Sequence, residues 1–187
     1  MKENMRIYMS GSHSVGKSTL ARFISKKYDL PIVTEVARSV LAEKELSLKD
    51  IRINIDSADL FQEEIFYRQI KEEQKYTSFI SDRSIDCLAY SAQHTRILST
   101  LINSPELKEY INKLKEKESL VFFVRPCKET LAQDGVREDL DWDGVMAIDS
   151  MIKLLLEMFD IPHFQINTPN MQERVRLIDS LLNKVKP

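Results

Sequence analysis

Gly11-Ser12-His13-Ser14-Val15-Gly16-Lys17-Ser18 matches in full the GxxxxGK[ST] pattern of a loop that holds phosphate groups. A short apolar run at residues 5–9 precedes the loop, and helical spacing of apolar residues over 20–28 follows it. The sequence therefore predicts a loop between a strand and a helix, where backbone N–H groups and the helix N-terminus can surround an anion. Because two of the chain's four glycines, Gly11 and Gly16, occupy the glycine positions of the pattern, an incidental turn is a weak alternative.

Each position of this loop has a chemical task in binding a nucleoside triphosphate. Backbone N–H groups from Ser12 to Lys17 are predicted to turn toward the phosphates, and the Lys17 ammonium group is predicted to reach the β- and γ-phosphates. The hydroxyl of Ser18 is predicted to bind Mg²⁺. The expected cofactors are therefore ATP and Mg²⁺. The expected nucleotide-binding residues are Gly11, Ser12, His13, Ser14, Val15, Gly16, Lys17, Ser18 and Thr19.

Size and composition limit the classes of protein to which this chain can belong. With 187 residues, 43% of them hydrophobic, and no shift in composition, we expect one domain over residues 1–187. A net charge of −2 provides no general attraction to nucleic acid, and no apolar run approaches the roughly 20 residues that cross a membrane. Cys87 and Cys127 are far apart and lack metal-ligand spacing, so we expect reduced thiols in a cytoplasmic protein.

Apolar runs and helical patterns alternate along the rest of the chain. Further short strands are expected at residues 31–34, 76–81, 120–124 and 163–166. The run Leu-Val-Phe-Phe-Val at 120–124 is typical of a parallel strand that is buried on both faces. Because helical patterns separate these strands, the sequence predicts an α/β fold with a parallel sheet and helices on both of its faces.

Polar residues follow three of the predicted strands, at the edge of the sheet where ligands gather in folds of this kind. Glu35 and Arg38 follow the second strand. Asp82 and Arg83 follow the third strand, and Arg125 follows the fourth. An acidic residue in the position of Asp82 is expected to organise Mg²⁺, and the arginines are expected to hold an anionic ligand.

A polar segment at residues 133–139 lies within a predicted lid of about residues 126–143 and carries Arg137. Closure of such a lid over a phosphate acceptor would exclude water, which would otherwise hydrolyse the triphosphate. Arg137, Lys17 and Mg²⁺ would together neutralise the phosphoryl group that is transferred. The predicted catalytic residues are Lys17, Glu35, Asp82, Arg83 and Arg137, and the predicted metal ligands are Ser18 and Asp82.

The residues expected to contact the acceptor are Glu35, Arg38, Gln62, Gln69 and Arg83. Several of these residues have a structural alternative. Asp82 could cap the next helix, Glu35 could be a first-turn acid favoured by the helix dipole, and the arginines could form surface ion pairs. A solvated helix face is the commoner role for the two glutamines, which lie in a helical pattern over 57–75.

Several short motifs, taken in order, resemble those of small bacterial and bacteriophage P-loop kinases related to the nicotinamide riboside kinase domain. The motifs are Gly-Ser-His-Ser-Val-Gly-Lys-Ser-Thr-Leu at 11–20, Thr-Glu-Val-Ala-Arg at 34–38, Ser-Asp-Arg-Ser-Ile-Asp at 81–86 with Ala89-Tyr90, Asp-Gly-Val-Arg at 134–137, and Glu173-Arg174. Asp82-Arg83-Ser84 is also similar to motifs of deoxynucleoside and thymidylate kinases. The resemblance covers nearly the whole chain and implies a nucleoside/nucleotide kinase fold with a five-stranded parallel core and a lid. It further implies that Glu35 contacts the acceptor or magnesium, and it raises the expectation of a homodimer.

Two kinds of small acceptor remain open for such a kinase. A nucleoside presents a hydroxyl that benefits from a general base, which Glu35 or Asp82 could be, whereas a monophosphate arrives ionised and chiefly needs arginines. The available arginines favour a nucleoside monophosphate, such as a pyrimidine deoxynucleotide, over a free nucleoside. A kinase that acts on a modified base in DNA is one alternative. A regulatory P-loop ATPase coupled to a protein partner is another, although the chain lacks the guanine-specific Asn-Lys-x-Asp stretch of many switch proteins.

Overall fold

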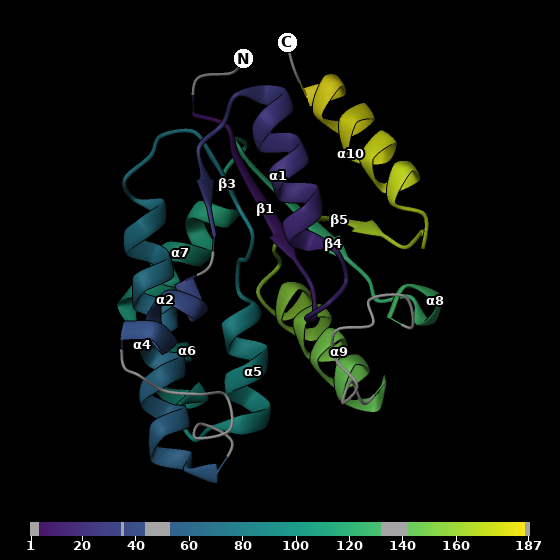
Figure 1. Ribbon diagram of the computed structural model, residues 1–187. Coiled ribbons are helices and arrows are strands. Elements are labelled where there is room, and N and C mark those ends of the chain that lie inside the picture. Colours follow the sequence, from purple (N-terminus) through teal and green to yellow (C-terminus); the bar gives the residue numbers. More distant parts are fainter. Residues whose placement is uncertain (1–3, 35, 44–52, 132–141, 186–187) are drawn as a thin grey trace.

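The computed structural model describes residues 4–34, 36–43, 53–131 and 142–185, and Figure 1 shows a sheet with helices on both sides. Five parallel strands form this sheet in the order β2-β3-β1-β4-β5. The strands are β1 (Arg6–Ser10), β2 (Ile32–Val33), β3 (Phe79–Ser81), β4 (Ser119–Val124) and β5 (His163–Ile166). The expectation of an α/β fold with a five-stranded parallel sheet is therefore confirmed.

β1 lies at the centre of the sheet and pairs with β3 on one side and β4 on the other. Tyr8 of β1 lies opposite Ser81 of β3 and Val121 of β4. Because the strands are parallel, their carboxyl ends meet at one edge of the sheet. The predicted phosphate loop follows Ser10, so it leaves the sheet at the middle of this edge, between the ends of β3 and β4.

The helices cover both faces of the sheet (Figure 1). They are α1 (Lys17–Tyr28), α2 (Val36–Glu43), α4 (Ile55–Glu73), α5 (Asp86–His94), α6 (Leu98–Asn103), α7 (Pro105–Leu114), α8 (Lys128–Leu131), α9 (Trp142–Met158) and α10 (Met171–Val185). Apolar residues of α1 and α10 pack with Ile7 and Met9 in one cluster, whereas those of α2, α4, α5, α6, α7 and α9 pack with Tyr8 in another. Successive side chains of β1 thus enter opposite cores, as expected for a strand covered on both faces. None of the helices in the described ranges is long and apolar enough to cross a membrane.

Two elements differ from the sequence-based expectation. β3 begins at Phe79 and not at Tyr76, because the N–H groups of Lys75 and Tyr76 still donate to carbonyls in the last turn of α4. The six-residue helix α6 was not expected, since a helix of less than two turns shows too little periodicity to be recognised.

A buried polar cluster joins α4, β3 and α7 around Glu73. Its Oε1 accepts hydrogen bonds from Gln69 Nε2 at 2.6 Å, from Ser81 Oγ at 2.9 Å and from the Tyr110 hydroxyl at 3.1 Å. Glu73 is 1% exposed, and its second oxygen has no partner in the described part of the chain. Burial raises the pKa of this carboxyl to about 7 from an ordinary value of 4.5.

The raised pKa of Glu73 makes stability depend on pH. The stabilisation from the protonated carboxyl is complete below about pH 4.5 and is lost as the pH rises through about 7. Glu73→Gln keeps a neutral group at all pH values. We therefore expect the difference in free energy of unfolding, variant minus wild type, to increase by about 2 to 3 kcal/mol when the pH is raised from 5 to 8.

Urea denaturation at the two pH values measures this difference. Glu72→Gln is the matched control, because Glu72 is the preceding residue but is only half-buried and pairs with Lys75. A pH-independent difference between Glu73→Gln and the wild type would contradict the prediction.

Candidate active site

The phosphate loop has a shape that only its two glycines permit. Gly11 has a φ of +153°, and a Cβ at this position would lie 2.4 Å from the carbonyl oxygen of Val124 at the end of β4. Gly16 has a φ of +89°, in the left-handed region, and a Cβ there would lie 2.7 Å from Cε of Met171. The loop is therefore packed tightly between the end of β4 and the start of α10.

Lys17 begins α1 and turns its side chain back toward the loop. Its Nζ donates to the carbonyl oxygens of Gly11 at 2.7 Å and Ser12 at 2.6 Å, and the residue is 7% exposed. Burial lowers the pKa of Lys17 to about 8, while the negative charge of Asp86 raises it and the positive charge of Arg83 lowers it. An amine with this pKa is still mostly charged at neutral pH. Lys17 can therefore offer a positive charge to phosphates held in the loop.

Ser18 and Asp82 form a pair that fits a magnesium ion. The Ser18 hydroxyl donates to Asp82 Oδ2 at 2.5 Å, and Asp82 Oδ1 is buried without a hydrogen-bond partner in the described residues. Burial raises the pKa of the Asp82 carboxyl, and the hydrogen bond from Ser18 lowers it. Mg²⁺ binds carboxylate and hydroxyl oxygens and keeps several waters, so one carboxylate and one hydroxyl suffice beside the phosphates. A magnesium ion held by Ser18 and Asp82 would neutralise part of the charge of the phosphates.

Two further observations bear on this magnesium assignment. α5 begins after Ile85 without a side-chain cap, so Asp82 does not have the helix-capping role that the sequence left open. Across the described ranges, three or more His, Cys, Asp or Glu side chains are nowhere grouped so that they could hold a metal. A metal at Ser18 and Asp82 would therefore depend on phosphate oxygens and water for its other ligands.

Asp86 holds the start of the loop from outside. Its Oδ1 accepts hydrogen bonds from Ser10 Oγ at 2.9 Å and from the N–H of Gly11 at 2.8 Å. Its Oδ2 accepts from the N–H of Ser84 at 3.1 Å, and Asp86 is fully buried. One carboxylate thus ties together the end of β1, the loop and the start of α5.

Tyr90 holds the loop at a second point. Its hydroxyl accepts a hydrogen bond from the N–H of His13 at 3.1 Å and lies 2.9 Å from His13 Nδ1. Because Asp86 and Tyr90 are four residues apart on α5, their side chains lie on the same side of that helix. Both residues belong to the motif Ser-Asp-Arg-Ser-Ile-Asp with Ala89-Tyr90, which by itself indicates no role for either. An acidic and an aromatic residue spaced four apart, directly after a predicted strand end, were the available signal.

The structure places other predicted residues at different distances from the loop. Arg83 is half-buried, and its charge lies close enough to lower the pKa of Lys17. Gln62 is half-buried on α4. Arg125 donates to the fully buried Asp149 of α9, with Nε 2.8 Å and Nη2 2.6 Å from Oδ2. The guanidinium of Arg125 is therefore engaged in an ion pair with the core.

Gln69 requires a correction to the sequence-based expectation. Its amide nitrogen donates to Glu73 Oε1 and to Ser81 Oγ, both at 2.6 Å, and the residue is 4% exposed. The structure thus gives Gln69 a role in the buried polar cluster, and we do not include it in the proposed acceptor site. Helical spacing alone could not reveal this role, because it does not identify the buried acceptor on α4 and β3.

Some predicted residues lie outside the described part of the chain. These are Glu35, Arg137 and residues 132–141 of the predicted lid, and the side chain of Arg38 is likewise not described. The flanking helices α8 and α9 include residues 128–131 and 142–143 of the predicted lid. The roles of Glu35, Arg38, Arg137 and the lid therefore stay predictions.

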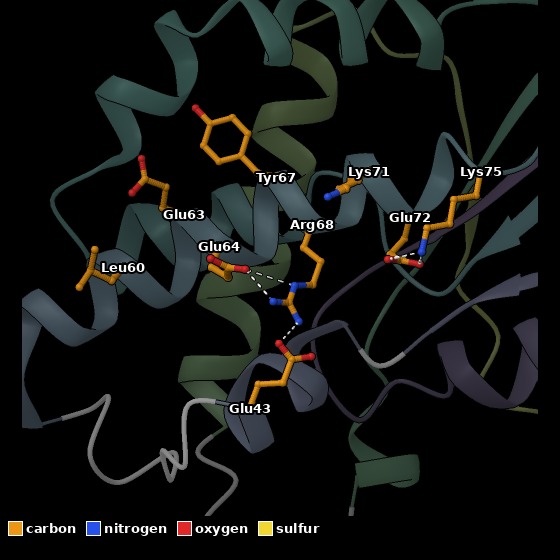
Figure 2. A pocket seen from close by; sticks show the side chains of 9 residues that line it. All are labelled: Glu43, Leu60, Glu63, Glu64, Tyr67, Arg68, Lys71, Glu72 and Lys75. Atoms are coloured by element: carbon orange, nitrogen blue, oxygen red, sulfur yellow. Dashed lines mark hydrogen bonds and ion pairs between the residues drawn. The ribbon is translucent and has the colours of Figure 1, made fainter.

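A surface hollow of about 700 Å³ lies along α4 (Figure 2). It is lined by Glu43, Leu60, Glu63, Glu64, Tyr67, Arg68, Lys71, Glu72 and Lys75. Figure 2 shows Arg68 donating to Glu43 and Glu64, at 2.7 and 2.8 Å. Because Arg68 and Lys75 pair with glutamates of the same hollow and none of its lining residues belongs to the loop, we do not include this hollow in the candidate active site.

The comparison with protein families accounts for most of the chain. Residues 6–174 match the family described as AAA domain, a span that includes the phosphate loop, Asp82 and Asp86. The chain belongs to the AAA_28 family. Among curated proteins, nothing matches this AAA domain.

The fold of this AAA domain is similar to that of several solved kinases. Deoxyadenosine kinase from M. mycoides with bound dCTP has a TM-score of 0.72 at 18% identity, over 96% of this chain and 100% of that chain. NadR in complex with NR has a TM-score of 0.74 at 16% identity, over 98% of this chain and 52% of NadR, so this chain spans about half of NadR. Shikimate kinase from Acinetobacter baumannii in complex with shikimate has a TM-score of 0.60 at 12% identity, over 98% and 94% of the two chains. These similarities confirm the fold of a small P-loop kinase.

Asp86→Asn should weaken nucleotide binding. In the wild type, one carboxylate oxygen accepts from the N–H of Gly11 and the other from the N–H of Ser84. The amide replaces one of these oxygens with an NH₂ group, so one of the two N–H groups would face a donor and lose its hydrogen bond. We expect the free energy of unfolding to fall by about 1–3 kcal/mol and the Kd for Mg·ATP to rise about tenfold or more. Chemical denaturation and titration calorimetry measure the two effects.

Asp179→Asn is the matched control for this variant. Asp179 accepts hydrogen bonds from Lys27 and Tyr28 at the far end of α1 from the loop. The Asp179→Asn variant should bind Mg·ATP with the same Kd as the wild type. If Asp86→Asn binds Mg·ATP as tightly as the wild type, Asp86 does not hold the loop in its binding conformation.

Proposed function

We propose that this AAA domain transfers the γ-phosphate of ATP to a nucleoside monophosphate, such as a deoxynucleotide, or to a nucleoside. The observation that carries this proposal is the contact of Ser18 in the phosphate loop with Asp82 at the end of β3, beside the buried ammonium group of Lys17. Phosphoryl transfer needs the charge of the moving group to be neutralised more than it needs covalent chemistry from the protein. Lys17, together with a magnesium ion on Ser18 and Asp82, is suited to that task.

The acceptor is expected beside Asp82, where Arg83 is also half-buried. Glu35 or Asp82 would serve as general base toward a nucleoside hydroxyl, whereas Arg38 and Arg83 would bind the phosphate of a monophosphate acceptor. Since Arg125 forms an ion pair with Asp149, the other two predicted arginines, Arg38 and Arg83, are left to bind the phosphate of a monophosphate acceptor.

The solved structures support the same class of acceptor. Deoxyadenosine kinase from M. mycoides binds dCMP and dCDP in one structure and dATP in another, and NadR binds NR. The TM-scores of these structures run from 0.62 to 0.74, compared with 0.60 and 0.56 for two shikimate kinases. Shikimate is therefore kept among the acceptors to be tested.

Two other functions remain as alternatives. One is a kinase acting on a modified base in DNA, which the net charge of −2 disfavours because DNA binding draws on positive charge. The other is a regulatory ATPase whose hydrolysis responds to a protein partner. A kinase should consume ATP slowly until its acceptor is added, whereas a regulatory ATPase should respond to a macromolecule.

The proposed function is tested by ATP consumption in the presence of Mg²⁺ with nucleosides, nucleoside monophosphates, nicotinamide riboside, shikimate and a short modified-base DNA, with product masses measured. We expect one small acceptor to gain a single phosphate. Lys17→Ala should lower the rate by at least about a hundredfold, since it removes the charge nearest the β- and γ-phosphates, and its circular dichroism spectrum should stay unchanged. Hydrolysis of ATP without a phosphorylated small acceptor, or normal turnover by Lys17→Ala, would contradict the proposal.

Arg38→Ala should distinguish the two kinds of acceptor. Because a guanidinium binds an ionised phosphate much more strongly than a neutral hydroxyl, the KM for a monophosphate should rise about tenfold or more. The KM for a nucleoside should change less. Steady-state kinetics of Arg38→Ala, with the exposed Arg176→Ala on α10 as control, measures the difference. An unchanged acceptor profile would give Arg38 a structural role.

A further inference from the structure

Arg174 of α10 is a buried arginine that reaches the phosphate loop from the opposite end of the sequence. Its side chain is among the largest that are fully buried, at 1% exposure. Its Nη1 donates to the carbonyl of Val15 within the loop, and its Nε donates to the carbonyl of Thr168 at 2.6 Å. Its Nη2 lies 3.3 Å from the carbonyl of Arg125 and 3.5 Å from the thiol of Cys127. One guanidinium thus connects the loop, the segment after β4 and the segment before α10.

Among the described residues, the hydrogen-bond partners of Arg174 include no acidic group. They are three backbone carbonyls and one thiol, and no carboxylate within the described ranges is close enough to form an ion pair with it. Burial of a charged group is costly, so such groups are normally paired with an opposite charge. A polyanion bound in the loop would supply that opposite charge on the other side of the Val15–Gly16 peptide.

The hydrogen bond to Val15 also fixes the direction of a loop N–H group. In a planar trans peptide the C=O and the following N–H point in opposite directions. Because the Val15 carbonyl points toward Arg174, the N–H of Gly16 points away from Arg174, which leaves it free of Arg174 for a phosphate in the loop. α10 packs closely here, since a Cβ on Gly16 would lie 3.6 Å from Arg174 Nη1.

We infer that Arg174 is a positioning residue for the triphosphate: it holds the Val15–Gly16 peptide in its phosphate-binding orientation and places a buried positive charge behind it. This inference rests on the proposed binding of ATP in the loop, but not on the identity of the acceptor. A buried charge acts over several ångströms with little screening by salt, so Arg174 contributes without touching the nucleotide. Replacement of Arg174 should therefore weaken the binding of ATP more than it slows phosphoryl transfer.

The test compares Arg174→Met, Arg174→Lys and a control by titration calorimetry with Mg·ATP, together with thermal unfolding. Tyr28→Phe is the control, because it removes a partly buried 2.6 Å hydrogen bond between α1 and α10 at the end of α1 that is remote from the loop. We expect Arg174→Met to raise the Kd for Mg·ATP about tenfold or more. Arg174→Lys keeps the charge but not the forked donors, so it should recover part of the affinity. Tyr28→Phe should lower the melting temperature and leave the Kd unchanged.

Kinetics with the phosphate acceptor separates positioning from a purely structural role. For Arg174→Lys, which keeps most of the packing, the KM for ATP should rise while kcat at saturating ATP stays within about twofold of the wild type. Wild-type affinity for Mg·ATP in Arg174→Met, or an equal loss of affinity in Tyr28→Phe, would overturn the inference. Because the main readout is ATP binding, a wild-type protein that binds ATP but phosphorylates no acceptor would contradict the proposed kinase activity alone.

Discussion

A loop that directs its N–H groups toward a phosphate cannot pair those groups with its own carbonyls, so its shape must be imposed by the residues around it. In this protein the supports come from both sides of the sheet. Asp86 and Tyr90 of α5 hold Gly11 and His13 from one side, and Arg174 of α10 holds Val15 from the other. The supports are buried or half-buried and act through backbone atoms. They can therefore fix the shape of the loop whatever side chains the loop carries at its variable positions.

The electrostatics of the site follow from the same arrangement. Asp82 and Asp86 lie near Lys17 and raise its pKa, which opposes the larger effect of burial. Positive charges of Lys17, Arg83 and Arg174 lie on several elements around the loop, whereas the whole chain carries a net charge of −2. Attraction of a phosphate is thus a local property of this edge of the sheet, and composition gives no sign of it.

Prediction from the sequence worked best at positions that only one type of residue can occupy. Gly11 is required by its φ and by close contact with a backbone oxygen of β4, and Gly16 is required by its φ. The apolar run at 120–124 has few uses other than a buried strand. Residues whose role depends on distant partners were harder to assign. Gln69 looked like a polar helix face but bonds to Glu73 and Ser81 in the core, and no local pattern identifies such partners. Asp86 lies in a recognised motif, but its role as acceptor for the N–H of Gly11 depends on the fold placing the two residues side by side.

The contact between Arg174 and Val15 joins residues that are 159 positions apart. The loop precedes α10 in the chain and is synthesised before it, yet one of the supports of the loop belongs to α10. A nascent chain that has not yet emerged through α10 therefore has the complete nucleotide-binding motif without this brace. Contacts of such long sequence separation close large loops and carry a high entropic cost during folding. The ability to bind a nucleotide should consequently appear late in folding, after most of the sheet has formed.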